Sequence, residues 1–256
     1  VLVSLFALSE FGEPGMIFLD EVNRNSPVLH LGRITATNPC GEQPLLPNES
    51  CNLGSINLSH YVSTDDVDWN RLAKTVRTSI HMLDNVIDAN QYAVPEIEEI
   101  TKATRKLGLG VMGFADMLIM LGVRYDSTEG IDLGRRTMRF IQETADGESR
   151  RLAEARGPFP AWDGSPIEQA GETPLRNACR LTVAPTGTIS MIVGCSSGIE
   201  PIFSLAFRKH NILGGETLYY VDRNFDNVAR ARGFYSEELM EFLADGGSLQ
   251  ERDDVP

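Results

Sequence analysis

The sequence predicts an α/β fold, and three observations support that prediction. Apolar residues make up 42% and charged residues 23% of the 256 residues, which is the balance of a globular protein with a buried core. Apolar side chains recur every three or four residues over 69–87, and the cap at Asp126–Glu129 opens a second helical stretch that can run to Ala155. Short apolar runs at 16–20 and 181–185 are typical of buried strands.

The charge of the chain argues against two classes of partner. Lys and Arg number 23 and Asp and Glu number 36, so the formal net charge is -13. Proteins that bind nucleic acid or anionic membranes need clustered Lys and Arg. No apolar run approaches the length of a membrane span, and Val1–Leu8 lacks the basic region of a signal peptide. We therefore expect a cytoplasmic protein that binds neither nucleic acid nor membranes.

The four cysteines, at 40, 51, 179 and 195, predict free thiols. Their number and spacing match neither a secreted disulfide framework nor a zinc site, so no metal ligands are expected. The chain begins without Met and ends without a closing element, which predicts a segment of a longer polypeptide.

The N-terminal part combines one expected strand with a long irregular segment. Met16–Asp20 follows a turn at Gly12–Gly15, so it is expected to be a buried strand. Residues 35–60 follow no helical or strand period, and their three prolines exclude a helix. Such segments in compact proteins are usually functional or disordered. Interspersed apolar residues favour a packed loop: Leu45, Leu46, Leu53, Ile56 and Leu58.

Helices are expected to dominate the middle of the chain. The apolar steps between Trp69 and Ile87 form one face of a long helix. Pro95 suits the first turn of the next helix, expected over 96–106, which has acids early and bases late.

The second half of the chain is expected to contain helices and one strand. Asp126–Glu129 looks like an N-cap with an acid three residues on, opening a helix to Ala155 that Gly157 and Pro158 stop. Leu181–Pro185 is expected to be a strand, and Thr186–Thr188 a turn into another helix. A last amphipathic helix is expected over 236–243.

The glycines at 108, 110 and 113 match the spacing of a dinucleotide-binding loop but not its context. That motif follows a strand, whereas a helix is expected directly before Gly108. No acid closes a second strand about twenty residues later. We interpret these glycines as serving close packing and a turn.

Pro185–Ser190 is a candidate phosphate site. A strand that runs into a Gly-containing turn and a helix start points unpaired N–H groups at one spot. Thr186, Thr188 and Ser190 add hydroxyl donors. The alternative, ordinary helix capping by Thr or Ser, stays open at this point.

Asn38, Cys40 and Glu42 form the most specific pattern. In an extended loop residues at i, i+2 and i+4 point the same way, which would join an amide, a thiol and a carboxylate. Gly41 permits a ligand to approach the backbone. The alternative is a loop whose cysteine is merely buried. A thiol protease would need a partnered His, and none of the four His residues has that context.

Several long stretches, in order, closely resemble the large chain of ribonucleotide reductases. Their residues resemble those of the class II, adenosylcobalamin-dependent branch. The resemblance runs from about Gly12 to the end. The stretches are Asn38–Pro47, Glu49–Leu58, Lys106–Asp116, Ala184–Ser190 and Ser196–Pro201.

The resemblance implies part of a ten-stranded α/β barrel with a central finger loop. Cys40 matches the cysteine that becomes a thiyl radical and takes the 3′-hydrogen of the ribose. Glu42 matches the base for the 3′-hydroxyl, and Asn38 a hydrogen-bonding partner in that site. Cys51 matches one of two thiols that reduce the 2′-position and end as a disulfide. Radical chemistry of this kind requires shielding from water.

The resemblance also implies a cofactor, a substrate and partners. The substrate phosphates are expected at Pro185, Thr186, Gly187, Thr188, Ile189 and Ser190. Adenosylcobalamin is the expected cofactor, and a thioredoxin- or glutaredoxin-like protein the expected reductant. dNTP effectors would bind outside this segment, and the resemblance leaves room for a homodimer. Residues 1–256 would be the central-to-C-terminal portion of the catalytic barrel, with the upstream half and the C-terminal tail absent.

These implications give an oxidoreductase that reduces ribonucleoside diphosphates to 2′-deoxyribonucleotides for DNA synthesis. Two alternatives remain: a class I large chain that depends on a metal subunit, and a non-catalytic nucleotide-binding relative. Cys179 and Cys195 are expected to be small buried residues without a role. The side chains of Asn38, Cys40 and Glu42 are expected to converge on one cavity, with the 185–189 turn across it.

Overall fold

The structure is a computed structural model that describes residues 15–64, 66–212, 216–253 and 255. The chain divides into two compact units. Unit 1 comprises the described parts of Val1–Leu53, Ile80–Gly108 and Ala145–Thr182, and unit 2 those of Gly54–Ser79, Leu109–Thr144 and Val183–Pro256.

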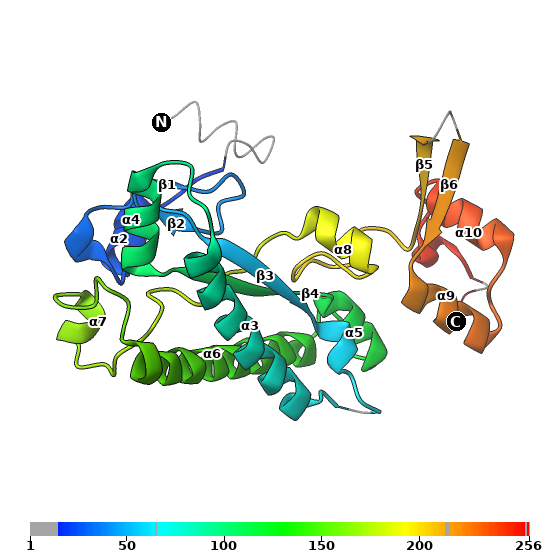
Figure 1. The fold of residues 1–256 in the computed structure, drawn as a ribbon. Coiled ribbons are helices and arrows are strands. Elements are labelled where there is room, and N and C mark those ends of the chain that lie inside the picture. The colour runs from blue at the N-terminus through cyan, green and yellow to red at the C-terminus, as the bar shows by residue number, and fades with distance from the viewer. Residues whose placement is uncertain (1–14, 65, 213–215, 254, 256) are drawn as a thin grey trace. The chain divides into compact units, whose positions relative to one another are not determined.

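The described residues form helices and short strands (Figure 1). The α-helices are α2 (Leu19–Arg24), α3 (Trp69–Ala89), α4 (Pro95–Thr104), α5 (Phe114–Met120), α6 (Thr128–Arg156), α7 (Pro166–Gln169), α8 (Gly187–Val193), α9 (Arg223–Arg232) and α10 (Glu237–Ala244). The strands are β1 (Ala36–Thr37), β2 (Pro44–Leu45), β3 (Asn52–Asn57), β4 (Leu107–Met112), β5 (Ala206–Ile212) and β6 (Glu216–Val221). Short 3-10 helices cover Leu29–Leu31, Leu58–Tyr61 and Leu249–Glu251.

The strands pair in three two-stranded sheets, β1 with β2, β3 with β4, and β5 with β6. In the first, Ala36 faces Leu45 and Thr37 faces Pro44 in antiparallel register. The pair β5 and β6 is also antiparallel. The α/β class is therefore confirmed, and these sheets do not close into a barrel within the described residues.

Unit 1 has a core of its own. Seven buried apolar residues pack together there: Val28, Ile34, Leu46, Phe159, Trp162, Leu175 and Ala178. The rings of Phe159 and Trp162 meet edge to face, with centroids 5.5 Å apart. Leu46 belongs to this core and comes directly after β2, so the end of the β1–β2 hairpin is anchored in the core of unit 1.

A buried carboxylate ties unit 1 together. Asp84 on α3 is fully buried, and four side chains donate to it. Arg105 Nε and Asn177 Nδ2 reach Oδ1 at 2.9 Å, and Arg156 Nη1 and Arg176 Nε reach Oδ2 at 3.3 and 3.4 Å. These donors come from segments far apart in sequence, so the Asp84 carboxylate links several segments of unit 1.

Unit 2 contains a second core at the C-terminal end. Buried residues of β5, α9 and α10 form it: Ala206, Phe225, Ala229, Leu239, Met240 and Leu243. Figure 1 draws the β5–β6 hairpin beside α9 and α10. Ser236 caps α10 by accepting a hydrogen bond from Leu239 N–H at 3.0 Å. None of the helices in the described ranges is long and apolar enough to cross a membrane.

The long helices confirm the sequence predictions. α3 and α6 cover the expected stretches, Pro95 occupies the first turn of α4, and α10 follows Ser236. α6 ends before Gly157, whose φ of +84° lies in the left-handed region. β4 carries the glycines at 108 and 110, and α4 rather than a strand precedes it, so the dinucleotide loop was correctly rejected.

Three local predictions are wrong. Residues 16–20 form no strand: α2 begins at Leu19, and Phe18 is 67% exposed, because a short apolar run does not distinguish a strand from a helix end. Residues 181–185 contain only an isolated bridge residue at Leu181. The N-cap of α6 is Ser127, whose Oγ accepts from Gly130 N–H at 3.0 Å, rather than Asp126.

Residues 35–60 contain no α-helix, as expected, but they are not irregular throughout, since β1, β2 and β3 lie there. Only part of the segment is packed. Leu46, Ile56 and Leu58 are buried, whereas Leu53 is 44% exposed. The sequence did not predict β5, β6 or α9.

Candidate active site

The Asn38–Gln43 segment is the turn of the β1–β2 hairpin. Asn38 N–H donates to Gln43 O at 3.1 Å, and Gly41 N–H donates to Asn38 O at 3.0 Å. Gly41 has a φ of +86°, a conformation that glycine adopts without strain. The expectation of an extended register for Asn38, Cys40 and Glu42 is therefore wrong, because Pro39 and Gly41 favour a turn. Cys40 lies in this turn and is exposed, so the expectation that its side chain faces one cavity with Asn38 and Glu42 is not met in the described residues.

The Asn38 side chain holds the turn closed. Its Oδ1 accepts a hydrogen bond from Gln43 N–H at 2.9 Å. Together with the backbone bond between the same two residues, this contact fixes the two ends of the turn. Asn38 thus sets the position of Cys40 and Glu42, which lie between the bonded ends.

Glu42 has one buried oxygen that the described residues leave without a hydrogen-bond partner. That atom is Oε2. The backbone of Glu42 is anchored, since Thr182 Oγ1 donates to its carbonyl oxygen at 2.7 Å. A buried carboxylate oxygen without a partner costs stability, and this one is free to accept a hydrogen bond.

Cys51 lies just before β3, in the same unit as the hairpin. Gln43 Nε2 donates to its Sγ at 3.2 Å. Burial raises the pKa of the Cys51 thiol from 9.0 to about 12, with smaller contributions from Cys179 and Glu49. Lys106 and the Gln43 hydrogen bond act in the opposite direction on this pKa. The thiol is therefore neutral at physiological pH and available as a hydrogen donor.

A buried ion pair supports the base of the hairpin. Lys106 Nζ contacts Glu49 Oε2 at 2.7 Å, and both side chains are almost fully buried. The other Glu49 oxygen accepts from Thr104 Oγ1 at 2.6 Å, and Leu46 N–H donates to Oε2 at 2.8 Å. Because every charge has partners, the pair holds its neighbours in one geometry.

The protonation of Cys51 gives a prediction for chemical labelling. Only the thiolate reacts with iodoacetamide, and a rise in pKa from 9.0 to about 12 lowers the thiolate fraction at pH 8 about a thousandfold. We expect peptide mass spectrometry to find Cys51 unlabelled at pH 8 and increasingly labelled above pH 10. Full labelling of the denatured protein is the control. Rapid labelling of folded protein at pH 8 would contradict the prediction.

The 185–190 segment joins a strained residue to a short helix in unit 2. Thr186 is the N-cap of α8 and has a φ of +54°, which is rare for a residue with a side chain. Its Oγ1 accepts from Gly198 N–H at 2.7 Å, and Ser190 Oγ lies 3.0 Å from Ser197 Oγ. Both hydroxyls are buried and engaged within the protein, whereas Pro185, Gly187, Thr188 and Ile189 are exposed.

Asp116 anchors the turn that holds this segment. Its Oδ2 accepts from Ser196 N–H at 2.6 Å, and its Oδ1 accepts from Asn224 Nδ2 at 2.6 Å. Burial, followed by the charge of Asp116, raises the pKa of Cys195 to about 11. The Asp116 carboxylate thus fixes the 196–198 turn that contacts Thr186.

Sequence reasoning missed three residues of this arrangement. Gln43, Asp116 and Thr182 each make a contact across a large sequence separation, which no local pattern reveals. Cys179 and Cys195 are half-buried rather than buried, and Cys179 influences the Cys51 thiol. Within the described ranges, no group of three or more His, Cys, Asp or Glu is placed to hold a metal ion.

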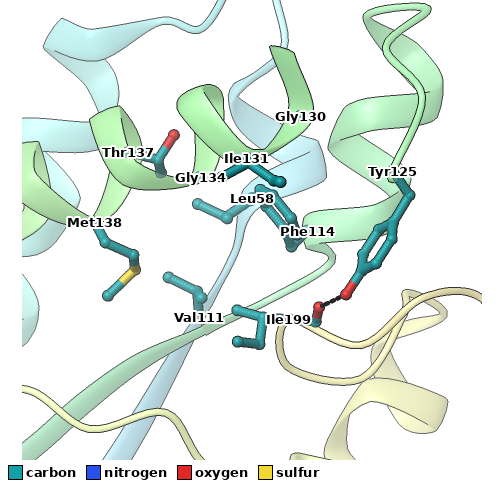
Figure 2. A pocket seen from close by; sticks show the side chains of 10 residues that line it. All are labelled: Leu58, Val111, Phe114, Tyr125, Gly130, Ile131, Gly134, Thr137, Met138 and Ile199. Carbon is teal, nitrogen blue, oxygen red and sulfur yellow. Dashed lines mark hydrogen bonds between the residues drawn. The ribbon is translucent and has the colours of Figure 1, made fainter. Parts of the chain in front are cut away.

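A separate apolar cavity of about 250 Å³ lies in unit 2 (Figure 2). Its wall includes Phe114, Tyr125 and Ile199, and the Tyr125 hydroxyl donates to the Ile199 carbonyl at 2.7 Å. None of the predicted site residues lines this cavity. The candidate catalytic residues lie on the hairpin of unit 1, and the predicted phosphate segment belongs to unit 2.

Comparisons with known proteins point to one family. The sequence matches the family described as ribonucleotide reductase, barrel domain, over residues 5–172 and 167–256. A vitamin B12-dependent ribonucleoside-diphosphate reductase of Thermoplasma acidophilum is 54% identical over 93% of this chain and 31% of that protein. One from Mycobacterium tuberculosis is 51% identical over 93% of this chain and 34% of that protein.

More distant relatives carry related names. A ribonucleoside-diphosphate reductase subunit alpha of Chlamydia pneumoniae is 32% identical over 98% of this chain and 28% of that protein. The solved structure of the Actinobacillus ureae class Id ribonucleotide reductase alpha subunit superposes with a TM-score of 0.75 at 25% identity, covering 99% of this chain and 46% of that one. The chain spans about a third of the length of the B12-dependent relatives.

Proposed function

This chain belongs to the ribonucleotide reductase barrel-domain family, and we propose that the protein it forms reduces ribonucleoside diphosphates to 2′-deoxyribonucleotides. The observation that carries the proposal is the β1–β2 hairpin turn. It joins an exposed thiol, Cys40, to a carboxylate, Glu42, whose buried Oε2 has no partner among the described residues. Transfer of a hydrogen atom from the 3′-carbon of a ribose and of a proton from its 3′-hydroxyl needs that combination.

The Cys40 thiol fits a radical-generating cofactor. It is exposed among the described residues, so the shielding from water that radical chemistry requires would have to form when cofactor and substrate bind. Adenosylcobalamin would supply the radical chemistry needed at such a thiol. The identity of 51–54% to B12-dependent reductases, against 32% to a subunit alpha, favours this class over one that depends on a metal subunit.

The residues of the chain divide the reaction among them. The Cys40 sulfur radical takes the 3′-hydrogen atom, while Glu42 Oε2 accepts the proton of the 3′-hydroxyl. The 2′-hydroxyl leaves as water, and Cys51 with a second thiol supplies two electrons and two protons. Cys40 finally returns its hydrogen atom to the 3′-position. In sum, a ribonucleotide and two thiols give a deoxyribonucleotide, a disulfide and water.

The partners follow from this balance. A disulfide at Cys51 must be reduced after each turnover, so a thioredoxin- or glutaredoxin-like dithiol protein in the reducing cytoplasm is the proposed electron source. dNTP effectors bind outside this segment, and a homodimer is the proposed assembly. The substrate phosphates are proposed to bind the 185–190 segment, through backbone N–H groups at the start of α8.

Replacement of Glu42 by Gln tests the proposed function. In the full-length protein we expect Glu42→Gln to lower kcat by about a hundredfold to ten-thousandfold, because an amide does not accept the 3′-hydroxyl proton. Substrate affinity should change little, since Gln keeps the shape of the side chain. Glu143→Gln, at a solvent-exposed position of α6, is the control. A Glu42→Gln enzyme with the wild-type kcat would exclude this proton acceptor.

Gly187→Val tests the phosphate loop separately. A Cβ at Gly187 has no heavy atom within 4 Å and the residue has no positive φ, so the fold should tolerate the change. The added methyl groups would meet a phosphate bound at the α8 N–H groups. We expect an unchanged melting temperature and substrate binding weakened by about tenfold or more, since N–H bonds to a charged group are lost. Titration calorimetry of the full-length protein measures the affinity, and equal binding would place the phosphates elsewhere.

A further inference from the structure

Gln43 connects the segments of unit 1 that carry Cys40 and Cys51. It follows Glu42 directly and is 3% exposed. Its backbone N–H and C=O both bond to Asn38, so its main chain closes the turn that carries Cys40. Its side chain leaves the hairpin and donates from Nε2 to Cys51 Sγ at 3.2 Å.

The Gln43 amide has little freedom. Nε2 also approaches the Leu107 carbonyl oxygen at 3.4 Å, so the amide is held between Cys51 and β4. Gly108 makes room for it, because a Cβ at that position would lie 3.0 Å from Gln43 Nε2 and closer still to Leu53 Cδ2. The donor is therefore aimed at the sulfur by packing as well as by hydrogen bonds.

A hydrogen-bond donor beside the Cys51 sulfur would stabilise negative charge on it. Cys51 itself donates to the Asn52 carbonyl at 3.4 Å, so its proton is engaged and its lone pairs face Gln43. When the thiol gives up a proton or shares electrons in a forming disulfide, negative charge develops on the sulfur. A buried N–H donor stabilises that charge more than it stabilises the neutral thiol.

We propose that Gln43 is a positioning residue that couples hydrogen abstraction at Cys40 to reduction by Cys51. This inference rests on the proposed function. The side chain fixes the Cys51 sulfur relative to the hairpin and stabilises charge on it as two thiols become a disulfide while the substrate loses its 2′-hydroxyl as water. Without Gln43, Cys40 still starts the reaction, but the reduction that must follow is slow.

The test uses Gln43→Met in the full-length protein, since Met has a similar length and no N–H. Substrate consumption should continue, while the ratio of deoxynucleotide to released free base falls on the order of tenfold to a hundredfold, the loss expected for one hydrogen bond to a charged group. Gln142→Met, at an exposed position of α6, is the matched control and should keep the wild-type ratio.

A second readout needs no turnover. Labelling of Cys51 by iodoacetamide should shift to higher pH in Gln43→Met, because a donor to the thiolate is lost. Cys179, Glu49 and Lys106 also act on this thiol and are unchanged in the variant.

The two readouts separate the failure of this inference from that of the proposed function. An active wild-type enzyme whose Gln43→Met variant keeps both the product ratio and the labelling profile would overturn the role of Gln43 alone. A wild-type protein that forms no deoxynucleotide would overturn the proposed function, and the labelling profile would then still decide whether Gln43 acts on Cys51.

Discussion

The Cys40→Ser variant of the full-length protein should form no deoxynucleotide. An O–H bond is stronger than an S–H bond. The radical that would take the hydrogen atom from the Cys40 thiol therefore cannot take it from a serine hydroxyl. The turn should be preserved, because its hydrogen bonds involve Asn38, Gly41 and Gln43 rather than the Cys40 side chain. Product analysis by chromatography measures the loss.

Cys51→Ser provides the contrast. Its hydroxyl cannot form the disulfide, yet Cys40 and Glu42 remain intact, so the reaction should start and then release free base from a stranded intermediate. A loss of all substrate consumption in both variants would show that Cys51 is needed before the first step. Near-normal deoxynucleotide formation by Cys40→Ser would remove Cys40 from the mechanism.

Asp84→Ala should cause the largest loss of stability. Asp84 is fully buried and accepts bonds from Arg105, Asn177, Arg156 and Arg176. Its removal leaves the buried Arg105 with Asp88 as its remaining counter-charge and takes a carboxylate partner from Arg156 and Arg176. Breaking a buried ion pair in this way typically costs about 3–5 kcal/mol. Urea denaturation followed by circular dichroism measures the change in free energy of unfolding.

The control for Asp84 is an ion pair of the same type on the surface. Asp132 pairs with Arg135 at 2.9 Å on α6, and both side chains are mostly exposed. Exposed pairs contribute little, so Asp132→Ala should leave the unfolding midpoint nearly unchanged. Equal midpoints for the two variants would mean that the Asp84 cluster does not hold unit 1 together.

The parts of the fold that the sequence predicts are those with a long local signal. α3 repeats its apolar step over Trp69–Ala89, and the start of α4 is marked by Pro95. The strand expected at 16–20 rested on five residues, too few to establish a period. The hairpin β5–β6 was missed although two glycines, at 214 and 215, lie between the strands in the sequence and are typical of a tight turn.

For the candidate site too, the sequence predicts the parts with a local pattern and misses those that depend on long-range contacts. The composition of Asn38–Glu42 marks the loop, but Pro39 and Gly41 bend it into a turn that the alternating pattern does not reveal. The contacts that position it link Gln43 to Leu107 and Thr182 to Glu42, over separations of 64 and 140 residues. Such pairs arise from packing of the whole unit, and a single sequence carries no local record of them.

The most direct measurement of the central claim is an EPR spectrum of the full-length protein frozen during turnover with adenosylcobalamin and a ribonucleoside diphosphate. One sample contains ordinary cysteine and another contains cysteine deuterated at Cβ. A radical on the Cys40 sulfur predicts that deuteration changes the spectrum and that Cys40→Ser abolishes the signal. A signal that persists unchanged under both treatments would contradict the account.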